Sequence, residues 1–263
     1  MDYEFHEYEK KGHIAYVTIN RPERMNAHHP PCVHERWKIL SDFSDDSEMW
    51  VAILTGAGDK AFSAGNDLKY QAETVAAGTR KWTPPADESS GSIHKDFECY
   101  KPMIAAVNGY ALGGGFEIAL ACDIIIAAEH ATFGLPEPTV GLIAGGGGVH
   151  RLPRQLPLKV AMGMLLTGRH ITAGEAYRIG IVNEIVPLAD LIPTAEKWAT
   201  DIFRCAPLSV RASKEAAMKG LEMPLNEALR ATFPISEQMM TSEDTVEGPL
   251  AFSEKRPPDW KGR

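Results

Sequence analysis

Three short apolar runs constrain the fold of this 263-residue sequence more than any other feature. They cover residues 51–55, 103–107 and 124–128, and each is apolar at almost every position instead of at alternate positions. Strands with this pattern are buried on both faces, as in a parallel sheet that is covered by helices. Glycine-rich turns follow the first two runs, and a helix is predicted after each turn. The repeated pattern predicts a layered α/β architecture.

The flanking segments extend this layout with local signals of their own. Residues 14–19 form a β-rich run that ends in a turn-prone Asn-Arg-Pro, which predicts a strand. A helix is predicted over about 31–43, because proline stands in its first turn. Thr172 and Glu175 have the spacing of a capping box, which predicts a helix that ends near Gly180.

Two regions depart from the strand–turn–helix repeat. Residues 71–96 are rich in proline, glycine and serine, and long segments of this kind tend to be functional, so a loop or lid is predicted there. Beyond about residue 187 the strand signals fade and helical periods dominate. The sequence therefore predicts a core over residues 1–192 and a C-terminal helical region over residues 193–263.

The composition narrows the classes of function. A formal charge of −8 argues against nucleic acid or an anionic membrane as the main partner, although it leaves room for a local basic pocket. The best apolar run, residues 118–128, is interrupted by Asp123 and is too short for a bilayer. The acidic N-terminal residues lack the apolar stretch of a signal peptide, and the four cysteines are scattered without a C-x-x-C pair. We expect a cytoplasmic protein.

A glycine run at 113–115 precedes Glu117 and lies between a strand candidate and an apolar helix. Glycines at this place leave bare backbone N–H groups at the positive end of the helix, where a developing oxyanion can be stabilised. Glu137 stands between two prolines, so its backbone is stiff, as a positioned acid or base requires. Taken singly, each motif also fits a plain turn with a solvated glutamate, and both interpretations stay open at this point.

Other motifs favour competing chemistries only weakly. Residues 56–61 match the G-x-G-x-x-A pattern of dinucleotide binding, but a second turn follows where that fold needs a long helix. The histidines of HHPPCVH at 28–34 lack a second ligand group at a typical zinc spacing, and the serine-hydrolase pattern G-x-S-x-G is absent. Residues 145–148 are four glycines, which fit either an anion-binding turn or close chain packing. We expect neither a metal nor a nicotinamide cofactor.

Three separated motifs point in one direction when they are taken together. They are AFSAGNDL at 61–68, NGYALGGGFE at 108–117 and FGLPE at 133–137. In this order they resemble the crotonase (enoyl-CoA hydratase/isomerase) superfamily, and the likeness extends from about Ile14 to the C-terminus. The tail EGPLAFSEKR at 247–256, which leads to the terminal WKGR, is most similar to the carnitinyl-CoA (crotonobetainyl-CoA) dehydratase branch.

The resemblance implies a spiral of ββα units with a C-terminal α-helical trimerisation region, which builds homo-trimers that often pair into hexamers. It also implies an acyl-CoA thioester as substrate. We expect no cofactor and no metal, and neither nucleic acid nor a membrane as partner. By motif position, Glu117 and Glu137 match the catalytic glutamates, and the N–H groups of Ala64 and Gly114 match the oxyanion hole. Further contacts to the substrate or to CoA are expected at Arg24, Asn26, Ala27, Ala61, Ser63, Gly65, Asn66, Asp67, Leu68, Gly113, Phe252 and Lys255.

The implied reaction is the reversible hydration of an α,β-unsaturated acyl-CoA through an enolate, with carnitinyl-CoA and crotonobetainyl-CoA as one candidate pair. Both glutamates are present, whereas isomerases of the superfamily typically keep only the second, and dehalogenase relatives use an aspartate with a histidine. Isomerisation or hydrolysis through the same kind of enolate, and a non-catalytic CoA-binding protein, remain the alternatives. The sequence does not assign the roles of acid and base to the two glutamates.

The acyl group also stays open at this stage. Asn66, Ala144 and the histidine–proline run depart from the pattern of the family. For an acyl group that carries a quaternary ammonium, Tyr70, Trp82 or Phe116 could supply a cation–π contact.

Overall fold

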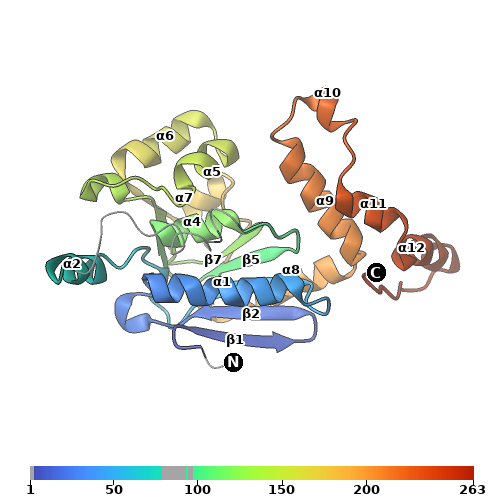
Figure 1. Ribbon diagram of the computed structural model, residues 1–263, viewed down its shortest axis with the longest axis horizontal. Helices are drawn as coiled ribbons and strands as arrows, with labels where there is room; N and C mark the ends of the chain where they lie inside the picture. The colour runs from blue at the N-terminus through green and yellow to red at the C-terminus, as the bar shows by residue number, and fades with distance from the viewer. Residues whose placement is uncertain (1–2, 79–92, 94–96) are drawn as a thin grey trace.

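The computed structural model of the protein describes residues 3–78, 93 and 97–263 (Figure 1). Its core contains two sheets. The larger sheet has six strands, which are, in spatial order, β1 (His6–Lys11), β2 (Ile14–Ile19), β3 (Val51–Gly56), β5 (Met103–Val107), β7 (Ile124–Ala128) and β10 (Glu184–Val186). The smaller sheet has four strands, which are β4 (Ala61–Ser63), β6 (Tyr110–Leu112), β8 (Thr132–Gly134) and β9 (His170–Thr172).

The strands alternate between the two sheets along the chain. β3, β5 and β7 lie parallel in the larger sheet, and the strand that follows each of them, β4, β6 and β8, lies parallel to its counterparts in the smaller sheet. Each pair thus turns from one sheet into the other before the chain continues into a helical segment. This repeat is the spiral of ββα units that the family resemblance implied.

The predicted apolar strands are confirmed, and their burial explains their composition. In β5 all five residues are buried, and β3 and β7 each have only one residue that is partly exposed. The second strand of each unit was not predicted from the local pattern, which placed a helix directly after the glycine turns. β4, β6 and β8 span three residues each, which is too short for a period of two to stand out.

Helices cover the sheets on both sides (Figure 1). The helical segments of the core are η1 (Pro22–Arg24), α1 (Pro30–Asp45), α2 (Leu68–Ala76), α4 (Gly114–Ala121), η2 (Glu137–Val140), α5 (Gly148–Gln155), α6 (Leu158–Thr167), α7 (Ala173–Arg178), η3 (Leu188–Asp190) and α8 (Leu191–Phe203). The predicted capping box is confirmed at its first residue, because the Thr172 hydroxyl accepts a 3.2 Å hydrogen bond from the Glu175 N–H at the start of α7.

The segment predicted as a loop over 71–96 begins differently. Residues 71–76 belong to α2, which Asp67 caps by accepting a hydrogen bond from the Tyr70 N–H. The prediction was wrong for this part, because the polar surface of a short helix gives little apolar periodicity. Most of the remainder of the segment, with Trp82, lies outside the described residues.

The C-terminal helices extend away from the sheets, at the right of Figure 1. They are α9 (Pro207–Gly220), α10 (Leu225–Ala228), α11 (Pro234–Met240) and α12 (Glu243–Glu254). The preceding helix α8 packs through Leu191, Ala195 and Ala199 against a buried cluster on the larger sheet. A division at 192/193 would cut α8 near its first turn, so we place the start of the helical region near Pro207 instead. In the part of the chain that the structure describes, no helix combines the length and the apolarity needed to cross a bilayer.

Candidate active site

The first helical turn of α4 lies against the strand β4. Gly113 precedes the helix at a φ of +53°, a conformation that favours glycine, and its N–H donates to the carbonyl of Gly134. A Cβ on Gly115 would overlap the carbonyl oxygen of Ser63. Gly114 is the first residue of α4, so its amide has no acceptor within the helix. The glycine run thus brings two chain segments together and leaves a donor at the helix end.

The amide that we predicted as the second donor of this site is engaged within the protein. The N–H of Ala64 donates a 3.0 Å hydrogen bond to the carbonyl of Met25 and is therefore engaged. Asn66 forms a parallel bridge with His28, in which the His28 N–H donates to Gly65 and the Asp67 N–H donates to His28. In this pairing the amide of Asn66 itself points away from His28.

Asn66 lies beside the N-terminal end of α4. A Cβ on Gly114 would lie 3.6 Å from Gly65 Cα and 3.8 Å from Asn66 Oδ1, and a Cβ on Gly65 would lie 2.8 Å from Gly114 N. Residues 65 and 66 therefore lie directly against Gly114. Because the Ala64 amide is engaged, the amide of Asn66 replaces it as the candidate for the second donor.

Glu117 is held by a second helix. It is 4% exposed, and its Oε1 accepts a 2.8 Å hydrogen bond from the N–H of Gly148, the first residue of α5. Arg151, one turn further along α5, interacts electrostatically with Glu117, and burial lowers the pKa of its guanidinium. The end of the four-glycine run is thus an amide donor to a carboxylate, and it is also closely packed, because a Cβ on Gly148 would lie 2.9 Å from Ala144 Cβ. A helix N-terminus and a nearby cation both stabilise the ionised form of a carboxyl group.

Glu137 has a contrasting environment. It lies at the start of η2, and its Oε2 is buried without a hydrogen-bond partner among the described residues. The pKa of Glu137 is raised to about 7, mainly by burial; a hydrogen bond from its own backbone opposes this shift, and the negative charge of Glu117 contributes to it. A Cβ on Gly113 would lie 2.9 Å from Glu137 Oε1. The two glutamates and the glycine run therefore form one site.

Two of the residues predicted to contact the substrate, Asn26 and Asp67, have side chains that are engaged in bonds within the protein. The Asn26 amide donates to the carbonyls of Ala57 and Ala61 and accepts from the N–H of Arg21. Asp67 forms a buried ion pair with Arg21 at 3.1 Å and caps α2. These side chains shape the loops around the site, and the prediction that they contact the substrate is not supported.

The other predicted contacts divide by exposure. Gly113 is buried and lies against Glu137, as described above. The other buried residues are Ala27, Ala61, Ser63 and Gly65. Arg24 is partly exposed, and Asn66 and Leu68 are exposed. Phe252 and Lys255 lie at the C-terminal end of α12, far from α2 and the site in Figure 1. One chain therefore does not bring these two residues to its own glutamates. Phe116 also differs from expectation, because it is fully buried and packs edge-on against Phe133.

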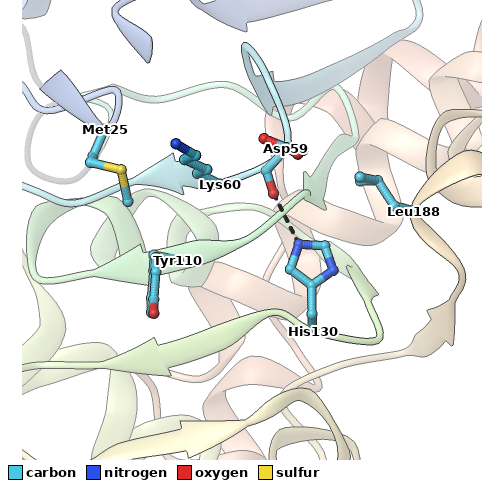
Figure 2. A pocket seen from close by; sticks show the side chains of 6 residues that line it. All are labelled: Met25, Asp59, Lys60, Tyr110, His130 and Leu188. Atoms are coloured by element: carbon cyan, nitrogen blue, oxygen red, sulfur yellow. Dashed lines mark hydrogen bonds between the residues drawn. The ribbon is translucent and has the colours of Figure 1, made fainter. Parts of the chain in front are cut away.

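A hollow of about 460 Å³ lies next to these loops (Figure 2). It is lined by Met25, Asp59, Lys60, Tyr110, His130 and Leu188. His130 hydrogen-bonds to the carbonyl of Asp59 at 3.0 Å, and Lys60 is the lysine among the lining residues. A smaller hollow of about 150 Å³ adjoins it and shares Met25, Asp59 and Lys60. Lys60 is not among the predicted contacts, although it directly precedes the motif at 61–68.

The described residues contain no group of three or more His, Cys, Asp and Glu side chains arranged to hold a metal ion. His28, from the histidine-rich run, is buried and hydrogen-bonds to Ser63 and Arg36. His29 packs edge-on against Phe5 and Tyr70.

Comparison with known proteins places the chain in a family. The family described as enoyl-CoA hydratase/isomerase matches residues 9–263. Carnitinyl-CoA dehydratases of Escherichia coli and Shigella flexneri are each 44% identical over 261 residues, which cover 97% of this chain and 97% of theirs. A putative short chain enoyl-CoA hydratase of Novosphingobium aromaticivorans has a similar structure, with a TM-score of 0.89 and 38% identity over 99% of this chain and 100% of that one. An enoyl-CoA hydratase of Mycobacterium tuberculosis gives a TM-score of 0.89 and 35% identity over 98% and 99%. The chain belongs to the enoyl-CoA hydratase/isomerase family.

Proposed function

We propose that this protein catalyses the reversible addition of water to an α,β-unsaturated acyl-CoA thioester. The observation that carries the proposal is the pairing of two glutamates in opposite environments beside two amide donors. Glu117 accepts a hydrogen bond from a helix N-terminus, whereas burial raises the pKa of Glu137 to about 7. Near neutral pH such a pair offers one carboxylate and one group that is partly protonated.

The amides of Asn66 and Gly114 form the oxyanion hole in this proposal. The thioester oxygen gains charge as the enolate forms, and two fixed N–H donors stabilise that charge in the transition state more than in the ground state. Two observations support this assignment. Asn66 forms a parallel bridge with His28, in which its own amide points away from His28, and Gly114 is the first residue of α4.

In the hydration direction, the Glu117 carboxylate accepts a proton from water as the water oxygen attacks the β-carbon. The π electrons of the double bond move towards the thioester oxygen, which is held by the two amides. Glu137 then transfers its proton from Oε2 to the α-carbon, which completes the addition of one water molecule. The reverse reaction uses the same groups in exchanged protonation states.

The hollows beside β4 provide a place for the CoA nucleotide. Lys60 lines both of them and supplies a positive charge for a phosphate. Phe252 and Lys255 contact CoA only from a second copy of the chain, because α12 lies far from the site of its own chain. We therefore propose a homo-trimer or a hexamer built through the C-terminal helices. The four cysteines are free thiols, which supports a reducing compartment such as the cytoplasm.

For the acyl group, we propose carnitinyl-CoA and crotonobetainyl-CoA as the first pair to test. The support is the 44% identity to proteins named carnitinyl-CoA dehydratase. Of the three aromatic candidates, Tyr70 on α2 is partly exposed, whereas Phe116 is buried in the core and Trp82 lies outside the described residues; we therefore propose Tyr70 for the contact with the quaternary ammonium.

The test is a panel of enoyl-CoA thioesters that includes crotonobetainyl-CoA and crotonyl-CoA. Turnover is followed as loss of the conjugated thioester absorbance in isotopically labelled water, and the product is analysed by mass spectrometry. Hydration places the label on the β-carbon, whereas isomerisation places no label and thioester hydrolysis releases free CoA. A protein that binds CoA without turnover of any thioester would be the non-catalytic alternative.

A further inference from the structure

A buried chain of hydrogen bonds connects helix α1 with the loop that carries Asn66. Arg36 Nη1 lies 3.3 Å from His28 Nδ1, and His28 Nε2 lies 3.1 Å from Ser63 Oγ. Ser63 Oγ also accepts a 3.1 Å hydrogen bond from the N–H of Gly65. All three side chains are buried, with exposed fractions of 1% for Arg36, 4% for His28 and 0% for Ser63.

The chemistry of the groups fixes the direction of this chain. A guanidinium only donates, so His28 Nδ1 must accept from Arg36, and the proton of the neutral imidazole is on Nε2. His28 therefore donates to Ser63 Oγ, whose two lone pairs are taken by His28 and by the Gly65 N–H. The protons of this chain therefore point in one direction, from Arg36 to His28 and from His28 to Ser63.

His28 also holds the same loop through its backbone. Its N–H donates to the carbonyl of Gly65 at 2.7 Å, and its carbonyl accepts from the N–H of Asp67 at 2.8 Å. Its contacts therefore reach residues 63, 65 and 67, on both sides of Asn66. Gly65 adopts a φ of +85° directly against Gly114, so a small shift of the loop changes the angle between the two amides.

A buried cation at this place is costly for the fold. Burial lowers the pKa of Arg36, and its Nη2 has no hydrogen-bond partner among the described residues. An apolar side chain of similar volume would avoid the desolvation of the charge. Arg36 is therefore not explained by packing of α1 alone.

We propose that Arg36, His28 and Ser63 are positioning residues that set the direction of the Asn66 N–H towards the thioester oxygen. This inference rests on the proposed function. Stabilisation of an oxyanion requires donors within a narrow range of position, and a misplacement of a fraction of an ångström weakens it. The substrate contacts none of the three side chains in this account.

The experiment uses matched variants of the full-length protein. Glutamine in His28→Gln can still accept from Arg36 and donate to Ser63, whereas His28→Leu fills the space without either bond. Arg36→Lys keeps a donor for His28, whereas Arg36→Met removes it. Ser63→Ala removes the hydroxyl that bonds to His28 and Gly65, with only a small change in volume. The readouts are kcat, KM, the affinity for CoA, and the absorbance shift of a bound aryl-conjugated enoyl-CoA, which reports the polarisation of its carbonyl.

We expect His28→Leu, Arg36→Met and Ser63→Ala to lower kcat by about tenfold or more, with KM and CoA affinity nearly unchanged and the absorbance shift reduced. His28→Gln and Arg36→Lys should keep most of kcat and most of the shift. Equal losses in the glutamine and leucine variants, or an unchanged shift in Ser63→Ala, would overturn the inference and leave a packing role. A wild-type protein with neither turnover nor an absorbance shift would instead contradict the proposed function.

Discussion

The N–H of Gly148 donates a 2.8 Å hydrogen bond to Oε1 of Glu117, which joins the start of α5 to helix α4. A Cβ on Gly148 would lie 3.1 Å from that oxygen and 2.9 Å from the Cβ of Ala144. The hydrogen bond and the absence of a side chain therefore act together. One glycine both orients the carboxylate and leaves space for it.

We predict that Gly148→Ala lowers kcat by about tenfold or more, because the added methyl group displaces Glu117 from its place beside the substrate. Overpacking should also destabilise the fold by about 1–3 kcal/mol. Steady-state kinetics and thermal unfolding measure the two effects. Gly145→Ala is the matched control within the same glycine run, because its Cβ would meet only Ile143, at 3.7 Å and beyond. If both variants are equally active, the contact between Gly148 and Glu117 has no role in turnover.

The pKa of Glu137 gives a prediction for stability. The folded protein has a pKa of about 7 at this carboxyl group, above the ordinary value of 4.5. Between these two values the folded state holds a proton that the unfolded chain has released, so this group lowers the stability as pH rises through that window. Glu137→Gln removes the buried charge.

The Tm of Glu137→Gln relative to wild type should therefore increase as pH rises from about 5 to about 8. Thermal unfolding across this range provides the measurement. Glu129→Gln is the control, because Glu129 is exposed and has no described ion pair. A Tm difference that is independent of pH would mean that Glu137 titrates normally in the folded protein.

Neighbouring glycines in α4 should respond differently to the same substitution. A Cβ on Gly114 has its nearest contact at 3.3 Å, with His28 Cδ2, whereas a Cβ on Gly115 would overlap the Ser63 carbonyl. Gly114→Ala should fold but lose about a hundredfold in kcat, because the methyl group keeps the thioester oxygen from the amide. Gly115→Ala should instead reduce the amount of folded protein.

Circular dichroism melts and turnover separate the two outcomes, and the larger Gly114→Val change should lose at least as much activity as Gly114→Ala. A folded and fully active Gly114→Ala protein would show that the oxyanion lies elsewhere.

The C-terminal helices and the loops that join them expose large apolar side chains, which include Leu221, Leu225, Leu229, Met240, Val246 and Phe252. Such a surface favours association of copies. Light scattering at micromolar concentration should therefore give a trimer or a hexamer. A Leu225→Glu/Leu229→Glu variant should form smaller species and show a higher KM for the acyl-CoA. A wild-type monomer with normal activity would contradict both the assembly and the role of Phe252.

The sequence predicted the parts of the fold that depend on local pattern. β2, β3, β5 and β7 lie at the expected positions, because each is a run of apolar residues bounded by a turn. β4, β6 and β8 are too short for such a signal. The composition of 71–96 predicts a loop, although its first part belongs to α2.

In the candidate site, too, the sequence indicates the segments involved but not the contacts between them. The motif at 61–68 indicates the loop of the proposed oxyanion hole, but the choice between Ala64 and Asn66 depends on which amide is engaged by Met25, about forty residues earlier in the chain. In the same way, the environments of Glu117 and Glu137 depend on α5 and on burial, which no spacing in the sequence reveals. The distance of Phe252 from the site also appears only in three dimensions.

The central claim is that Glu137 exchanges the proton at the α-carbon while Glu117 serves the oxygen at the β-carbon. The most direct measurement is the exchange of α-protons of a saturated acyl-CoA with deuterated solvent, followed by mass spectrometry. This substrate has no β-hydroxyl group, so the exchange needs the oxyanion hole and one base only. We predict that Glu117→Gln retains most of the exchange but loses hydration, and that Glu137→Gln loses both by about a hundredfold or more. Exchange at the wild-type rate in Glu137→Gln would contradict the account.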